Sequence, residues 1–207
     1  MAAAAAILIV AVVALNRGPG WTLAVEGTGT VEIDGVLVSL EDRDDLLARL
    51  RPGVRLKMPA NAEITLVADR TLALLFTSGS DATIPPPPAR WLGRASAIEM
   101  WAGEVRISTG VQFGGARIAV ATPNAAVEIT GTTIAVILDS AYTCVCVLEG
   151  TAGMGEPHGR MTDVSAGMRR FLYRDHSPSR VEPIDDMQRM KLTMFRDASG
   201  PRLGNTP

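Results

Sequence analysis

The sequence predicts a mostly β protein: a single twisted domain of short antiparallel or solenoid-like strands, with a short apolar helix before it and a helix after it. Short runs rich in Val, Ile and Thr alternate between apolar and polar residues at period two. Gly (20 residues) and Pro (13 residues) punctuate these runs, as many short strands and turns require. The runs recur at roughly ten-residue spacing from Thr22 to Tyr173, which suits a sandwich, a barrel or a solenoid alike.

The composition supports a folded core. The chain has 207 residues, of which 47% are apolar and 20% are charged, so it can bury enough surface to avoid disorder. Its formal net charge of −2 gives no argument for a nucleic-acid partner.

The chain begins with an unbroken apolar run, Ala2–Leu15. As a helix this run would rise about 21 Å, less than the roughly 30 Å hydrocarbon core of a bilayer. No Lys or Arg precedes it, so it lacks the basic start of a signal peptide. Three interpretations remain open: the end of a longer transmembrane anchor, a short anchor or weak signal, and a buried helix. We predict residues 1–16 to be a membrane anchor.

The β domain is predicted to span residues 22–174. Thr22–Leu40 alternates in hydropathy, and Asp34-Gly35 within it is a strong hairpin signal. Glu41–Arg49 is charged and fits a short helix or a loop. The next three strands are predicted at Val54–Met58, Glu63–Ala68 and Arg70–Thr77.

A run of four prolines, Pro85–Pro88, then excludes a central strand and favours polyproline II. A stiff surface loop is preferred over a ligand for a proline-binding module. Strands are expected at Ala95–Met100 and Gly103–Thr109, followed by a loop over Gly110–Gly115.

Residues 119–150 are expected to form the centre of the domain. Their three strand-like runs are Ala125–Thr130, Thr133–Asp139 and Tyr142–Leu148. Gly131, between two of them, suits a positive-φ turn or a tight corner. Pro123 should begin a strand or lie at an edge because it cannot donate to a ladder, and Gly150 and Gly167 should end strands.

The C-terminal region, 175–207, is predicted to be a linker, a helix and a tail. Met168–Tyr173 should be the last strand, and Asp175–Pro183 resembles a linker. Ile184–Phe195 carries apolar residues at helical spacing, at positions 184, 187, 190, 194 and 195. This helix could cap the domain or dock a partner, and capping is preferred. Asp197–Pro207 should fray.

The two cysteines, Cys144 and Cys146, lie two apart in a predicted strand and therefore share a face. A separation of roughly 7 Å is too long for an undistorted disulfide. Two cysteines without a nearby histidine cannot form a zinc site, so we interpret them as small buried hydrophobes.

No motif predicts an enzyme. His158 and His176 lie in expected loops, without a fixed nucleophile or an orienting carboxylate. The sequence contains no nucleophile elbow, phosphate loop or zinc-protease motif. We therefore predict no catalytic, cofactor-binding or metal-binding residue.

Five sequence pieces, in order, resemble the core of the FecR domain family over Trp101–Gly167. They are Met100–Arg106, Val120-x-Thr122-Pro123-x-Ala125-x-Val127, Gly131-Thr132-x-Ile134-x-Val136, Thr143-x-x-x-Val147-x-Glu149-Gly150 and Val164-x-Ala166-Gly167. The sequence departs from the family at Ile134, where Phe is common, and at Cys144 and Cys146. We take Thr122, Pro123, Gly131, Thr132, Glu149, Gly150 and Gly167 as the residues of this motif that shape the fold; Glu149 could also lie in an interface.

The resemblance implies a solenoid-like stack of strands with a signalling role. It suggests a single-pass protein of the bacterial inner membrane, anchored by Ala2–Leu15, with its β domain in the periplasm. Its partner would be an envelope protein of the sigma-regulatory or receptor type, and its role would be regulation of an extracytoplasmic-function sigma factor. The alternative is a structural or scaffold envelope protein that binds cell-wall polymer or another protein.

Overall fold

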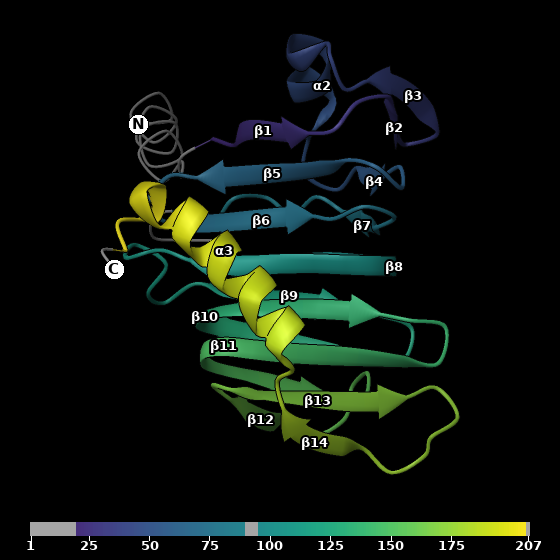
Figure 1. Ribbon diagram of the computed structural model, residues 1–207, viewed down its shortest axis with the longest axis vertical. Coiled ribbons are helices and arrows are strands. Elements are labelled where there is room, and N and C mark those ends of the chain that lie inside the picture. Colours follow the sequence, from purple (N-terminus) through teal and green to yellow (C-terminus); the bar gives the residue numbers. More distant parts are fainter. Residues whose placement is uncertain (1–19, 90–94, 206–207) are drawn as a thin grey trace, which may run out of the picture.

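The computed structural model describes residues 20–89 and 95–205. These residues form one open sheet of 14 strands and two helices (Figure 1). In chain order the elements are β1 (Thr22–Glu26), β2 (Thr30–Ile33), β3 (Val36–Ser39), α2 (Arg43–Arg49), β4 (Arg55–Lys57), β5 (Glu63–Ala68), β6 (Leu72–Phe76), β7 (Asp81–Thr83), β8 (Ala95–Thr109), β9 (Arg117–Ala121), β10 (Ala126–Leu138), β11 (Tyr142–Gly155), β12 (Thr162–Ser165), β13 (Met168–Tyr173), β14 (Arg180–Pro183) and α3 (Asp186–Leu203). The mostly β prediction is confirmed.

The long hairpin of β10 and β11 divides the sheet into two halves. The C-terminal half of β10 pairs with β8, whereas its N-terminal half pairs with β9. Likewise, the first half of β11 pairs with β13 and its second half with β12. Core residues from both halves of β10, such as Val127 and Val136, belong to one buried cluster. The sheet therefore folds back on itself around a shared core.

The hairpin bends where its register shifts, between Ile129 and Thr132. At this bend Gly150 has a φ of 76°, and a Cβ atom there would lie 2.4 Å from the carbonyl oxygen of Gly131. Only glycine permits such a close approach of two backbones. The prediction that Gly150 ends a strand is wrong, because β11 continues through it.

Several local predictions are confirmed. The hairpin turn between β2 and β3 uses Asp34 and Gly35, with φ values of 48° and 81°, as a type I′ turn requires. The charged segment contains α2, whose first turn is capped by the Asp42 carboxylate accepting from the Asp45 backbone N–H at 3.0 Å. Strands β4, β5 and β6 lie within their predicted ranges.

Other boundaries were predicted wrongly. Two predicted strands are the single strand β8, which runs through Gly103. A Cβ at Gly103 would lie 2.5 Å from Ser80 Cα, so this glycine permits a close approach to a neighbouring segment and does not break the strand. The runs on either side of Gly131 also form one strand, β10. Strands β7 and β9 were not predicted, and β8 pairs with β9 in parallel.

The C-terminal region is part of the fold. Strand β14 lies inside the segment predicted as a linker and pairs with β13. Helix α3 continues to Leu203, and its end is fixed to the sheet by the Arg70 N–H bond to Arg202 O (2.8 Å) and the Val111 N–H bond to Leu203 O (3.1 Å). The predicted fraying from Asp197 is therefore wrong for the residues up to Leu203, because backbone hydrogen bonds hold the helix end.

The proline run lacks secondary structure, as predicted, but it is only partly a surface loop. Pro85 and Pro88 are buried, and Pro86 is exposed. The carbonyl oxygen of Pro85 accepts a hydrogen bond from Trp21 Nε1 at 3.2 Å. Packing against the start of β1 therefore holds part of this run inside the protein.

The apolar run Ala2–Leu15, predicted as a helix and anchor, lies outside the described residues. Neither α2 nor α3 in the described part of the chain is long and apolar enough to cross a bilayer.

The bend predicts a specific sensitivity at Gly150. We expect Gly150→Ala to lower the free energy of unfolding by about 3 kcal/mol, because it adds a steric clash to the cost of a left-handed backbone. Gly167→Ala is the matched control, since its φ is 79° but its Cβ would meet nothing within 4 Å. The control should lose about 1 kcal/mol. Urea unfolding measures both; equal losses would show that the close approach does not constrain the bend.

Candidate functional site

Helix α3 crosses one face of the sheet diagonally, from β14 toward β5 (Figure 1). Its buried side packs on two apolar clusters. Phe195 and Leu203 contact Val67, Ala73 and Leu75, and Leu192 packs on the strands β10 and β11. This packing explains why all five residues of β6 are buried, since the main core covers its other face. The preferred capping interpretation of the helix is confirmed.

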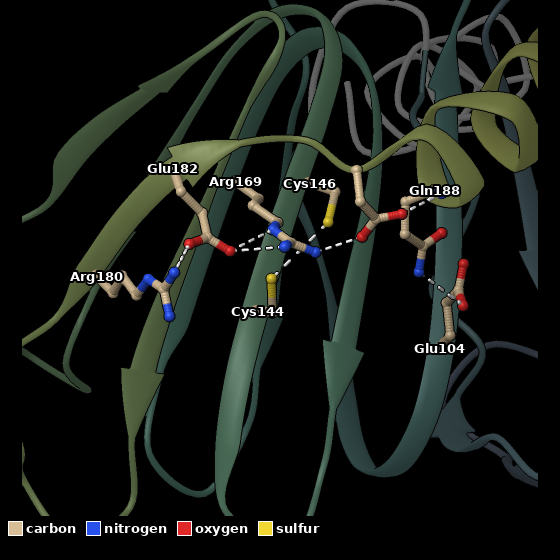
Figure 2. Close-up of polar contacts among 8 residues, drawn as sticks. Glu104, Cys144, Cys146, Arg169, Arg180, Glu182 and Gln188 are labelled. Atoms are coloured by element: carbon tan, nitrogen blue, oxygen red, sulfur yellow. Dashed lines mark hydrogen bonds and ion pairs between the residues drawn. The ribbon is translucent and has the colours of Figure 1, made fainter.

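A charged cluster fixes the N-terminal end of α3 (Figure 2). Arg169 on β13 donates from Nε to Glu182 Oε1 on β14 at 2.9 Å, and its Nη1 binds the Asp185 carboxylate. The same Asp185 caps α3 by accepting from the Gln188 N–H at 2.8 Å. One arginine thus joins the last strand to the helix cap. Arg180 binds Glu182 from the exposed side.

The two cysteines lie beneath α3, beside this cluster (Figure 2). Both are buried and free, with their Sγ atoms 3.8 Å apart, which confirms their interpretation as small buried hydrophobes. The hydrogen bond with Cys146 and burial raise the pKa of the Cys144 thiol far above its usual value. Deprotonation of the Cys144 thiol is therefore strongly disfavoured.

Two further polar contacts hold α3 along its length. Gln188 Nε2 donates to Glu104 Oε2 at 3.4 Å, and Glu104 Oε1 accepts from Arg106 Nε at 2.6 Å. Arg196 donates to Glu149 Oε1 at 2.6 Å. Glu149, a motif residue, therefore links β11 to the helix.

The outward side of α3 differs from the predicted apolar stripe. Ile184 and Phe195 are buried, but Met187, Met190 and Met194 are 63%, 57% and 65% exposed. The three methionines follow one another at i, i+3 and i+7, so they form one exposed ridge. Methionine is equally compatible with a buried and an exposed helix face, so the sequence pattern could not show which face of α3 is buried.

The other motif residues lie at three turns and bends. Thr122 and Pro123 lie in the β9–β10 turn, where Thr122 Oγ1 is 2.9 Å from Thr143 Oγ1, and Thr143 donates to Asn124 Oδ1 at 2.7 Å. Thr132 pairs with Thr109 beside Gly131 and Gly150. Gly167 lies in the β12–β13 turn. The structure thus brings Gly131, Thr132, Glu149, Gly150 and Gly167 together near the bend, where the Gly167 N–H donates to the carbonyl oxygen of Val147 at 2.8 Å, and leaves Thr122 and Pro123 apart from them.

The described residues contain no group of three or more His, Cys, Asp or Glu side chains that could hold a metal ion. His158 and His176 both have positive φ and lie in loops. The side chains in the 3.9 Å contact of His176 Nδ1 with Glu156 are largely exposed to solvent. The expectation of no enzymatic activity stays a prediction.

The sequence pattern does not indicate that Arg169, Glu182 and Asp185 form a cluster. Only strand alternation in Met168–Tyr173 signals that Arg169 faces the opposite way from Arg170. The partners of Arg169 come from a segment predicted to be a linker, so no local pattern could assign them.

No family model and no curated protein matches this sequence. Among solved structures, the fold is similar to that of a proposed anti-sigma factor from Parabacteroides distasonis ATCC 8503, with a TM-score of 0.55 and 12% identity over 73% of this chain and 75% of that one. A second structure of a proposed anti-sigma factor from the same organism gives a TM-score of 0.41 at 12% identity, over 79% of this chain and 61% of that one. The first similarity establishes a shared fold.

The charged cluster predicts unequal roles for two arginines that bind the same carboxylate. We expect Arg169→Ala to reduce the free energy of unfolding by about 2 kcal/mol, because two partly buried carboxylates, Glu182 and Asp185, each lose a charged donor. Arg180→Ala should cost less than about 0.5 kcal/mol, since Arg180 is largely exposed. Chemical denaturation measures both, and hydrogen exchange should show faster exchange in α3 only for Arg169→Ala. A larger loss from Arg180→Ala would contradict this assignment.

The buried thiols should report on the docking of α3. Because burial and the raised pKa keep Cys144 protonated at pH 8, an aromatic disulfide reagent should label neither cysteine within minutes in the native protein. Denaturant should expose two thiols per chain. Arg169→Ala should accelerate native labelling several-fold, and Arg180→Ala should not. Rapid labelling of the unaltered protein would show that α3 does not protect these residues.

Proposed function

We propose that this chain is a non-enzymatic regulator that acts through protein–protein contact in the control of a sigma factor. The observation that carries this proposal is the shared fold with a proposed anti-sigma factor over about three quarters of both chains. The FecR-like motif pieces add support, because they fall at the bend and turns that shape this fold.

The finer part of the proposal is an extracytoplasmic β domain held at the bacterial inner membrane by Ala2–Leu15. Support comes from the apolar character of that run and from its place before the β domain. The partner would be an envelope protein of the sigma-regulatory or receptor type, and the regulated factor would be of the extracytoplasmic-function class.

The test is genetic and uses the chain with its natural upstream sequence. Deletion of the gene should change transcripts dependent on one extracytoplasmic-function sigma factor several-fold, and the unaltered gene should restore them. Gly150→Ala should restore them poorly and Gly167→Ala well, because the first disturbs the bend. Protease added to spheroplasts should digest the β domain, whereas intact cells should protect it.

Two results would contradict the proposal. Unchanged transcripts from every such sigma factor after deletion would remove the regulatory role. A chain found wholly in the cytoplasmic fraction, and resistant to external protease, would remove the membrane anchor and the extracytoplasmic location.

A further inference from the structure

A groove of about 350 Å³ runs between α3 and the strands β1, β5 and β6. Its apolar wall includes Leu75 on the sheet and Met194, Phe195 and Ala198 on the helix. Met194 also belongs to the exposed ridge, so the ridge meets the groove at this residue.

The sheet wall of the groove carries two neighbouring glutamates. Glu26 on β1 and Glu63 on β5 are direct cross-strand partners and therefore lie side by side on the same face. Like charges directly opposite each other destabilise a sheet. Neither glutamate forms an ion pair among the described residues.

The cations that line the groove form no ion pair with these glutamates. Arg106 also lines the groove, but its guanidinium is bound to Glu104 at 2.6 Å. Lys191 lies on the helix wall and makes no ion pair with Glu26 or Glu63. Both carboxylates are therefore without an ion-pair partner among the described residues and could each pair with a cation supplied from outside.

We propose that this groove docks a basic amphipathic helix of the protein partner. The apolar side of the helix would lie on the exposed methionines, with Met194 at the edge of the groove and Phe195 and Leu75 at its floor, and its Arg or Lys side chains would reach Glu26 and Glu63. Methionine side chains suit such a surface because they are flexible and polarizable and adapt to the shape of a docked helix. This proposal rests on the proposed function, since it names the surface and the partner chemistry for that same contact.

The methionine spacing favours a helix as the docked element. Residues at i, i+3 and i+7 form a ridge on α3, and such ridges pack into the grooves of a second helix at an interaxial distance of about 8–10 Å. The exposed fractions of Met187, Met190 and Met194 show that no described element occupies this position.

Direct binding can be measured with a designed probe. An 18-residue fluorescein-labelled helix of Leu and Lys, amphipathic in pattern, is titrated with the full chain and followed by fluorescence anisotropy; a Leu and Glu helix of the same pattern is the control. The basic peptide should bind at least ten-fold more tightly than the acidic one, and its affinity should fall as salt is added.

The double variant Glu26→Gln, Glu63→Gln should weaken binding of the basic peptide at least five-fold. Its matched control is Glu41→Gln, Glu99→Gln, which removes the same charge at two exposed glutamates outside the groove. Met194→Asp should also weaken binding, because it places a charge on the apolar wall. Equal binding of both peptides, or equal losses in both double variants, would overturn the proposal.

The thermal stability of the chain tests the like-charge pair of Glu26 and Glu63 without a partner. Glu63→Gln should raise the melting temperature by roughly 1–4 °C, since it removes a like-charge cross-strand pair. Glu99→Gln should leave it unchanged. A lower melting temperature for Glu63→Gln would show that the glutamate pair is already compensated within the chain, which overturns the proposal.

Two results separate this proposal from the proposed function. If the Glu26→Gln, Glu63→Gln chain restores sigma-dependent transcription as fully as the unaltered chain, the docking surface is wrong and the regulatory role stands. If the basic peptide binds as expected but deletion of the gene changes no such transcript, the regulatory role fails and the groove stands. Concentration-dependent dimerisation abolished by Met190→Asp would assign the ridge to a second copy and overturn the proposal.

Discussion

The structure depends on the close approach of Gly131 and Gly150. At this point a long hairpin changes its neighbours: β8 and β13 flank one half, and β9 and β12 flank the other. A straight hairpin would expose one apolar face of each half. The bend brings both faces into one core, with Ile129 on one side and Ile134 on the other. Strands β12 and β13, both of which pair with β11, therefore lie on opposite sides of this bend.

Helix α3 fastens the bent sheet across its outer face. Its middle is held by apolar burial of Leu192 and Phe195, and its start by Arg169, which bridges the last strand and the helix cap. The two types of contact do different work. Apolar burial supplies most of the favourable free energy, whereas the charged cluster fixes where the helix begins. The diagonal path leaves part of this face uncovered beside the helix, which creates the groove.

Local patterns predicted the elements whose causes are local. The Asp34-Gly35 pair favours a type I′ turn whatever surrounds it. The alternation over Glu63–Ala68 requires only that one face of the strand be buried. Prediction failed where the cause is distant in sequence. Gly103 was predicted to begin a strand and Gly150 to end one, but each permits contact with a segment that the sequence does not place beside it. The sequence also could not predict which face of α3 is buried, because Met187 and Phe195 fit the same helical period although only Phe195 is buried.

The residues that shape the fold and the residues that offer a contact to other proteins lie in different parts of the chain. The FecR-like motif residues are occupied in closing turns, in the bend and in the bond from Glu149 to α3, so they support the fold and leave little free chemistry. The exposed apolar side chains and the unpaired carboxylates lie outside that motif, on the methionine ridge and at the Glu26–Glu63 pair. Natural sequences tend to keep local conflicts at functional positions. A like-charge pair next to an exposed apolar ridge is such a conflict, and a basic helix would resolve both parts at once.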